Sequence, residues 1–239
     1  MTKPAVCNII DEMKKRVRFQ NFLIFLAMTA SLLLSKFLFQ NWKREALDEF
    51  FDALGVTILL FGFLFRISAR GLKAKKSCNG KKLITDGLYS LIRNPMYFGT
   101  LLIGLGVILV IFKWWVFLLF FSIFLLIYIP QINKEEKELN KYFGDEYRLY
   151  CEKVPGYFPN ILALFRIDVR DYLFLEWPGV KKEIPSLIGV IIAVSAIEIW
   201  EDVRAFGDSE YVKELLELNL IVFFAIIFIL GYRKVKKDR

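Results

Sequence analysis

The chain has 239 residues, 56% of them hydrophobic, and its mean hydropathy is +0.45. A soluble domain is about half apolar and cannot bury such an excess in one core, so this composition indicates a membrane protein. The net charge is +8, but the basic residues lie between apolar runs. That arrangement favours contact with anionic lipid headgroups and argues against a nucleic-acid partner.

Residue types that are missing narrow the chemistry further. The sequence contains no histidine, which excludes Ser-His-Asp hydrolases, HExxH metalloproteases and His-ligated haem. The three cysteines, Cys7, Cys78 and Cys151, lie far apart and form no CxxC pair, so we expect no metal site. Any proton transfer must use Glu, Asp, Tyr, Lys or Cys.

Six apolar segments approach the roughly 17–25 residues that are needed to cross the hydrocarbon layer. No alternating strand pattern separates them. The sequence therefore predicts an all-α integral membrane protein with about six transmembrane helices. The segments are Phe19–Phe39, Phe50–Phe65, Met96–Phe112, Trp114–Pro130, Ile184–Trp200 and Leu218–Tyr232.

The charges between these segments predict the topology. Lys and Arg cluster before the first segment, after the second (where Arg66 and Arg70 begin the cluster) and after the last, whereas the loop between the fifth and sixth segments is acidic. Positively charged loops stay in the cytoplasm, so we expect a multi-pass protein with both termini cytoplasmic. We divide it into an N-terminal segment with the first membrane helix (1–49), a core (50–160), and an interfacial helix with a C-terminal membrane hairpin (161–239).

The third and fourth segments predict a tight helical hairpin. Lys113, followed by Trp114 and Trp115, is the one charge between Met96 and Pro130, and a lysine beside two tryptophans is typical of an interfacial turn. About 17 residues at roughly 1.5 Å per residue span about 25 Å, just enough to cross. The start of the third helix and the end of the fourth should therefore lie side by side at the cytoplasmic face.

Polar residues stand at these two ends of the hairpin. Arg93 and Tyr97 flank the start of the third helix, and Glu135 and Glu136 follow the fourth. Arginine suits a carboxylate, glutamate suits an ammonium group or a ribose diol, and a tyrosine ring suits a cation. S-adenosylmethionine carries all of these groups, so the residues permit this ligand without requiring it. Singly, each is also consistent with an interfacial arginine or a solvated helix face.

Two motifs contain these residues. The first is Gly87-x-Tyr89-x3-Arg93-Asn94-Pro95-x-Tyr97-x-Gly99, and the second is Glu135-Glu136-x2-Leu139-x3-Phe143-Gly144-x2-Tyr147-x2-Tyr150. In their order, and with a membrane hairpin between them, they resemble the signature of the isoprenylcysteine carboxyl methyltransferases and their prokaryotic relatives. The resemblance covers about residues 50 to 160, so it makes this part of the chain a methyltransferase core.

This resemblance implies an integral-membrane methyltransferase that binds S-adenosylmethionine in a pocket at the cytoplasmic face. A lipid-linked or prenylated acceptor would reach that pocket from within the bilayer. Arg93 and Glu135 would then be catalytic. The residues expected to bind the cofactor are Tyr89, Arg93, Asn94, Pro95, Tyr97, Gly99, Glu135, Glu136 and Leu139.

One position departs from the family pattern and leaves the acceptor open. Asn94 stands where the family usually has histidine, and the run Asn94–Tyr97 is similar to that of phosphatidylethanolamine N-methyltransferases. A carboxylate acceptor is already ionised near pH 7, whereas an amine must first lose a proton. The lack of histidine therefore favours a carboxylate or thiolate acceptor over an amine. We expect isoprenylcysteine-type carboxyl O-methylation, with phospholipid N-methylation as the alternative.

Other interpretations use the remaining parts of the chain. A membrane NADPH-dependent reductase of the sterol type would use the basic cluster Lys73–Lys82 for a 2′-phosphate, and a scaffold or small transporter would need no chemistry. Transport is disfavoured because no charge interrupts the middle of the third and fourth helices. The stretch Ile161–Trp177 mixes apolar and charged residues, which predicts an interfacial helix, either beside the lipid entrance or as a connector.

Overall fold

The structure is a computed structural model that describes residues 37, 46–77, 82–159, 172–173 and 175–206. The chain forms two compact units, Met1–Asn41 and Trp42–Arg239, and the helices described here belong to the second. Two predicted membrane segments, Phe19–Phe39 (except Phe37) and Leu218–Tyr232, fall outside the described residues, as does most of the predicted interfacial helix Ile161–Trp177. The predicted division of the chain into three parts stays a prediction.

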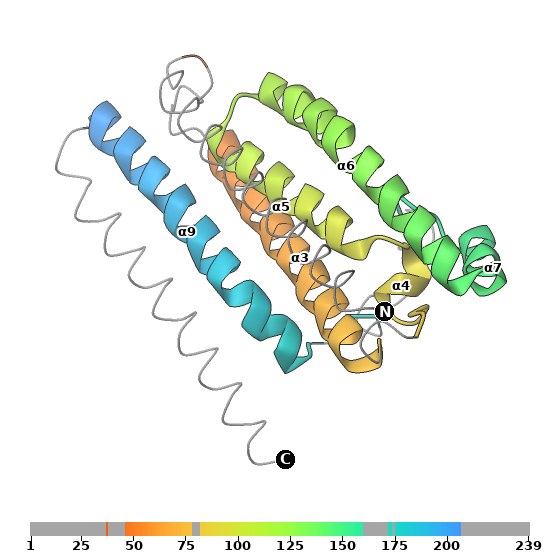
Figure 1. The fold of residues 1–239 in the computed structure, drawn as a ribbon. Helices are drawn as coiled ribbons and strands as arrows, with labels where there is room; N and C mark the ends of the chain where they lie inside the picture. Colours follow the sequence, from red (N-terminus) through yellow and green to blue (C-terminus); the bar gives the residue numbers. More distant parts are fainter. Residues whose placement is uncertain (1–36, 38–45, 78–81, 160–171, 174, 207–239) are drawn as a thin grey trace, which may run out of the picture. The chain divides into compact units, whose positions relative to one another are not determined.

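The described part is helical and contains no β-strand (Figure 1). This confirms the predicted all-α class for the described residues. Three of the predicted apolar segments lie within helices, and a fourth, Met96–Phe112, extends one residue beyond a helix that ends at Ile111. The helices are α3 (Ala46–Lys76), α4 (Leu88–Leu91), α5 (Pro95–Ile111), α6 (Trp114–Phe143), α7 (Asp145–Lys153) and α9 (Trp177–Phe206).

Two of these helices are long and apolar enough to cross a membrane. They are α3, over Phe50–Lys76, and α6, over its full length. Helix α5 is equally apolar but has 17 residues, about 25 Å at roughly 1.5 Å per residue. Phe112 and Lys113 separate α5 from α6, and Lys113 directly precedes the first residue of α6. The predicted hairpin and its turn are therefore present.

Two helices extend beyond the predicted apolar segments. Helix α6 continues through Pro130 to Phe143 and ends at Gly144, which has a φ of 56°; most residues after Pro130 are good helix formers, and a single proline removes only one helical hydrogen bond. Helix α3 continues to Lys76. The prediction that Arg66 and Arg70 belong to a loop after the helix is therefore wrong, because both lie inside α3.

Paired glycines bring α3 and α5 together. A Cβ atom at Gly106 would lie 2.5 Å from the carbonyl oxygen of Gly55, and one at Gly99 would lie 2.8 Å from that of Gly62. The residue order in these pairs makes the two helices antiparallel, and both helices repeat glycine every seven residues, which keeps the glycines on one face. Small residues permit this close approach, which is how membrane helices gain packing without a hydrophobic driving force.

Helix α9 packs along α3 (Figure 1), and a glycine again allows the two backbones to approach closely. A Cβ atom at Gly179 would overlap the carbonyl oxygen of Ile67 and lie 2.7 Å from the backbone nitrogen of Gly71. One turn further along α9, the wholly buried carboxylate of Glu183 contacts Arg66 and Arg70 of α3. Backbone proximity and an ion cluster thus hold α9 to α3.

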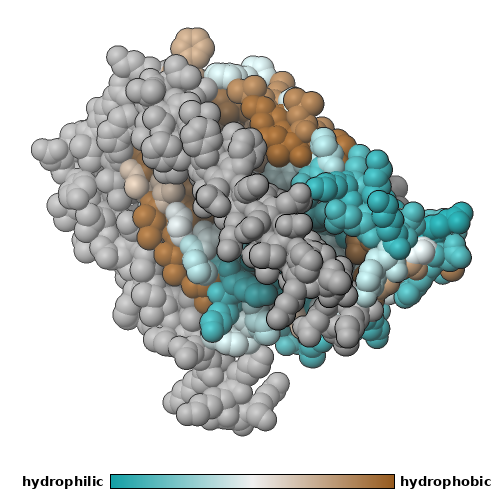
Figure 2. All heavy atoms as spheres, viewed as in Figure 1, coloured by the Kyte–Doolittle hydropathy of each residue, from teal (hydrophilic) through white to brown (hydrophobic). Residues whose placement is uncertain are grey.

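The surface separates into apolar and polar regions along α6 (Figure 2). Large apolar side chains are exposed on its N-terminal half, and hydrophilic residues cover its C-terminal half and α7. Exposed apolar residues on a long apolar helix are expected when lipid surrounds it. In this N-terminal half, the exposed large apolar residues are Trp114, Leu118, Leu119, Ile123, Leu126 and Ile127.

A methyl group at the α3–α5 contact should destabilise the fold. In Gly106→Ala the new Cβ would meet the Gly55 carbonyl oxygen and, at 2.7 Å, the backbone nitrogen of Leu59, and backbone atoms cannot turn aside. We expect a loss of about 1–3 kcal/mol, typical of overpacking, seen as a lower midpoint of thermal unfolding in detergent.

The matched control is Gly189→Ala in α9, where no atom of the described residues lies within 4 Å of the new Cβ. Because alanine favours a helix over glycine by up to about 1 kcal/mol, this variant should be neutral or more stable. Equal effects of the two substitutions would contradict close packing at Gly106.

Candidate active site

Separate stretches of chain meet where the α5–α6 hairpin ends. They are the turn before α5, the C-terminal half of α6, and the loop after α7. Tyr97 is hydrogen-bonded to Glu135 and Asn94 to Glu136, across 38 and 42 residues of sequence. These bonds confirm the predicted proximity of the two ends of the hairpin.

Glu136 binds two side chains from the turn before α5. The Arg93 Nη2 atom lies 3.2 Å from Oε2 of Glu136, and Asn94 Nδ2 donates to Oε1 at 2.9 Å. The side chains of Arg93 and Glu136 are 15% and 17% exposed, so solvent screens this ion pair only partly. Both Glu136 oxygens are therefore bonded to the turn that starts α5.

The loop after α7 closes against the same ion pair. Asn94 Nδ2 also donates to the Gly156 carbonyl at 3.0 Å, and the backbone N–H of Arg93 donates to the Pro155 carbonyl at 2.9 Å. A Cβ atom at Gly156 would overlap the Arg93 guanidinium and lie 3.2 Å from Oε1 of Glu136. Glycine at this position therefore lets the loop backbone lie directly against Arg93 and Glu136.

Glu135 has different surroundings from Glu136. Neighbouring helix positions point about 100° apart, so Glu135 faces the α5 side chain of Tyr97. Its Oε1 atom accepts hydrogen bonds from the Tyr97 hydroxyl at 2.5 Å and from Gln131 Nε2 at 2.8 Å. The Tyr97 ring packs edge-on against Tyr128, with 5.4 Å between ring centroids. One carboxylate is thus bonded to a guanidinium, and the other accepts from a phenol and an amide.

Three tyrosines around these carboxylates have hydroxyls that stay protonated. Burial, reinforced by the negative charge of Glu135, raises the pKa of Tyr89 far above its usual value. Burial and then Glu136 raise the pKa of Tyr147, and burial followed by Tyr89 raises that of Tyr150. The Tyr150 hydroxyl donates to the Tyr89 carbonyl at 2.6 Å. These phenols can donate hydrogen bonds near neutral pH, but they do not supply a phenolate base.

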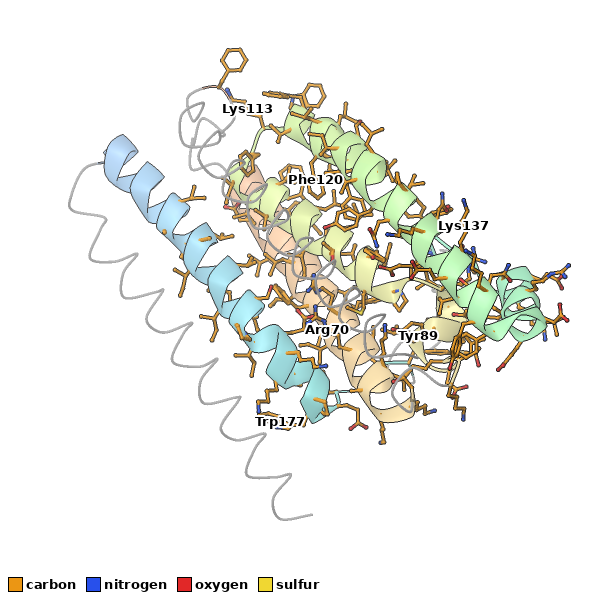
Figure 3. The ribbon with its side chains drawn as sticks, in the orientation of Figure 1. Arg70, Tyr89, Lys113, Phe120, Lys137 and Trp177 are labelled. Atoms are coloured by element: carbon orange, nitrogen blue, oxygen red, sulfur yellow. The ribbon has the colours of Figure 1, made fainter. Side chains whose placement is uncertain are left out.

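A pocket of about 490 Å³ opens beside Glu136, between α6 and α7. This volume falls in the range of small-molecule sites. Figure 3 shows Lys137, one of its residues, on the half of α6 nearest α7. Glu136 connects this pocket to Arg93 and Asn94. The residues that line it are Asn133, Glu136, Lys137, Asn140, Tyr147, Arg148, Cys151 and Glu152.

The other predicted site residues occupy varied positions. Tyr89 lies on α4 (Figure 3), and its hydroxyl is buried. Pro95 is fully buried at the first position of α5. Gly99 faces α3, where a Cβ would meet the Arg66 side chain. Leu139 is 36% exposed on α6. Their assignment to cofactor binding stays a prediction, and the α3 contact already accounts for the glycine at position 99.

The sequence interpretation missed Gln131 and Gly156. Gln131 lies four residues before Glu135 on a helix, and that spacing places the two side chains on one face. This spacing is visible in the sequence, but it predicts a contact only if the helix continues beyond Pro130, as α6 does. Gly156 carried no such signal, because its role depends on a backbone contact with Arg93 that the fold alone creates.

The structure thus combines long apolar helices, as found in membrane proteins, with a cluster of polar side chains at the end of the α5–α6 hairpin. This cluster is a candidate small-molecule site. Comparison with known families identifies the group: residues 23–146 match the phospholipid methyltransferase family, which is more than half of the chain. The chain belongs to the phospholipid methyltransferase family. This confirms the predicted family of integral-membrane methyltransferases.

One curated relative is also similar to part of the chain. It is the protein-S-isoprenylcysteine O-methyltransferase of Schizosaccharomyces pombe, with 34% identity over 88 residues. The matched stretch spans 37% of this chain and 37% of that relative. No solved structure matches the chain.

A second carboxylate beside Glu136 should make stability depend on pH. In Asn94→Asp the new carboxylate replaces a donor that lies 2.9 Å from Oε1 of Glu136. Two adjacent carboxylates raise the pKa of one of them in the folded state, so the folded protein binds more protons than the unfolded chain. Stability is then greatest at low pH and falls as pH rises through that raised pKa.

The measurement compares thermal unfolding of Asn94→Asp and Asn94→Ala at pH 5 and pH 7.5. Both variants lose the donated hydrogen bonds, but only the aspartate adds a charge. A pKa shift of one to two units corresponds to about 1.4–2.7 kcal/mol, which we expect the aspartate variant to lose relative to the alanine variant at the higher pH. A difference that does not change with pH would count against contact between residue 94 and Glu136.

Proposed function

We propose that the chain is an S-adenosylmethionine-dependent methyltransferase that acts on a lipid-linked or membrane-embedded acceptor. The observation that carries this proposal is the contact between the two motifs: Asn94 is bonded to Glu136, and Tyr97 to Glu135. Membership of the phospholipid methyltransferase family supports methyl transfer. We further propose about six transmembrane helices, cytoplasmic termini and a cytoplasmic site, on the basis of the Lys and Arg distribution.

The residues at the end of the hairpin fit the cofactor. The Arg93 Nε atom is buried and has no hydrogen-bond acceptor among the described residues, so its N–H group could donate to a carboxylate oxygen. Glu135 and Glu136 suit an ammonium group or a ribose diol, and the Tyr97 ring suits a cationic sulphonium. When bound, S-adenosylmethionine supplies an electrophilic methyl group.

The chain's own residues then act mainly by positioning. Arg93, Asn94 and Glu136 form a bonded unit whose geometry is fixed by the loop at Gly156. Fixed geometry is the main contribution that a protein makes to an in-line transfer, because the methyl group must lie between donor and acceptor. The leaving thioether is neutral and needs no general acid. Arg93 and Glu135 are therefore proposed to orient the reacting groups.

The surroundings favour a carboxylate acceptor. The chain has no histidine, and burial keeps the hydroxyls of Tyr89, Tyr147 and Tyr150 protonated. A carboxylate needs no base near pH 7. We therefore propose isoprenylcysteine-type carboxyl O-methylation, the activity named for the relative from Schizosaccharomyces pombe.

Phospholipid N-methylation is the second candidate. The matched family is described as phospholipid methyltransferase, and the run Asn94–Tyr97 is similar to that of enzymes acting on phosphatidylethanolamine. An amine acceptor must lose a proton before or during transfer. Glu135, Glu136 or water would have to receive it, because burial keeps the hydroxyls of Tyr89, Tyr147 and Tyr150 protonated.

Cofactor binding can be tested by calorimetry on the purified protein in detergent. We expect Glu135→Gln and Tyr97→Phe to weaken S-adenosylmethionine binding by about tenfold or more, since hydrogen bonds to charged groups contribute about 1.5–3 kcal/mol. Glu138→Gln is the matched control, because Glu138 is an exposed glutamate on the same helix. Wild-type protein that binds NADPH but not S-adenosylmethionine would contradict the proposal.

The acceptor can be identified by transfer of a labelled methyl group to a prenylcysteine analogue and to total membrane lipid. A carboxyl methyl ester releases its label in base, whereas a methylated amine retains it. We expect base-labile label on the prenylcysteine analogue. Base-stable label in the lipid fraction alone would instead assign phospholipid N-methylation.

A further inference from the structure

A second group of charges lies between α3 and α9, apart from the bonds around Glu135 and Glu136. Arg66 Nε lies 3.1 Å from one carboxylate oxygen of Glu183 and 3.2 Å from the other, and Arg70 Nε lies 2.6 Å from Oε1. Arg66 Nη1 also donates to Thr100 Oγ1 of α5 at 2.8 Å. We call these three charged residues, Arg66, Arg70 and Glu183, the α3–α9 cluster.

The α3–α9 cluster carries two positive charges and one negative charge. Arg66 is bonded to both oxygens of Glu183 and to Thr100, whereas Arg70 contacts a carboxylate that Arg66 already holds. The Nε atom of Arg70 is buried and, among the described residues, its contact lacks hydrogen-bond geometry. An uncompensated charge in a low-dielectric region is costly unless a counter-charge approaches. The cluster therefore keeps one surplus positive charge, which a further anion at Arg70 would offset.

Arg70 is the most solvent-exposed residue of this cluster. Its side chain is 29% exposed, compared with 17% for Arg66 and 0% for Glu183. Figure 3 shows Arg70 on α3, on the side toward α9. A ligand from outside the helix pair can thus reach the Arg70 guanidinium, while Glu183 stays enclosed.

The depth of Arg70 relative to the membrane indicates which kind of ligand can reach it. Arg70 lies in the stretch of α3 that is apolar and long enough to cross a membrane. On α9, exposed Lys181 and Lys182 precede Glu183, and exposed Ile188 and Ile192 follow it. A change from exposed lysines to exposed isoleucines is typical of the boundary between headgroups and acyl chains. Arg70 therefore lies near the depth at which lipid phosphates lie.

We propose that the α3–α9 cluster binds the phosphate of an anionic membrane lipid, with Arg70 as the main contact. A guanidinium can offer two parallel N–H groups to phosphate oxygens. Glu183, which is itself bonded to Arg66, holds Arg70 in place. The lipid phosphate would supply the missing negative charge and would join α3 to α9 from the bilayer side. This inference does not rest on the proposed methyl transfer.

The test measures how lipids change thermal unfolding of the full-length protein in mixed micelles. We expect phosphatidylglycerol to raise the unfolding midpoint of the wild type more than phosphatidylcholine does, in a saturable way. Arg70→Gln should weaken the apparent affinity for phosphatidylglycerol by about fivefold, as one basic contact to an anionic lipid is worth about 1 kcal/mol. This variant keeps the Arg66–Glu183 pair, and Arg70→Lys, which keeps the charge, should retain part of the effect.

Lys75→Gln is the matched control, because it removes the same charge from the same helix at an exposed pair with Glu176. It should leave the lipid effect nearly unchanged. An equal loss in Lys75→Gln would indicate general surface charge and overturn the proposal, as would full retention in Arg70→Gln. Inorganic phosphate is added in a parallel series, and stabilisation by it equal to that by phosphatidylglycerol would overturn the assignment to a lipid.

Discussion

The ion pair between Arg93 and Glu136 joins parts of the chain that an apolar hairpin would otherwise leave apart. Helices α5 and α6 present mostly apolar side chains along their length, so their polar groups gather where the hairpin ends. In surroundings that are only partly solvated, each such group needs a partner. Arg93, Asn94 and Glu136 provide partners for one another, and Asn94 also binds the loop at Gly156. The shape of the candidate site follows from this requirement.

The need for partners also gives the two adjacent glutamates different contacts. Glu136 is neutralised by a guanidinium, whereas Glu135 accepts hydrogen bonds from Tyr97 and Gln131. Adjacent carboxylates on a helix therefore serve different contacts, because successive side chains point in different directions. This arrangement suits a site that holds a ligand with several polar groups. It offers little acid–base chemistry, in agreement with the absence of histidine.

Some of this structure could be predicted from sequence because its signals are local. Lys113 beside two tryptophans marked the turn, and helix lengths then required residues near 94 and 136 to meet. The choice of partners could not be predicted, since side-chain direction decides that Asn94 contacts Glu136 while Tyr97 contacts Glu135.

The α3–α9 contact was missed for a related reason. The apolar segment predicted for the fifth helix begins at Ile184, one residue after Glu183, because hydropathy patterns exclude charged residues. Arg66 and Arg70 were assigned to a loop on the same basis. A hydropathy pattern ends a helix at each charged residue, so it cannot predict a buried carboxylate that pairs with two arginines inside helices.

Glu183 also has an evolutionary consequence. The family match ends at residue 146, whereas Glu183 belongs to α9, which begins at Trp177. Arg66 and Arg70 lie inside the matched region but depend on this carboxylate from outside it. A related sequence that lacks α9 should therefore also lack arginine at one or both of these positions. The two arginines and α9 therefore form one structural unit, and a chimaera that exchanges only one of them would leave buried charges without a partner.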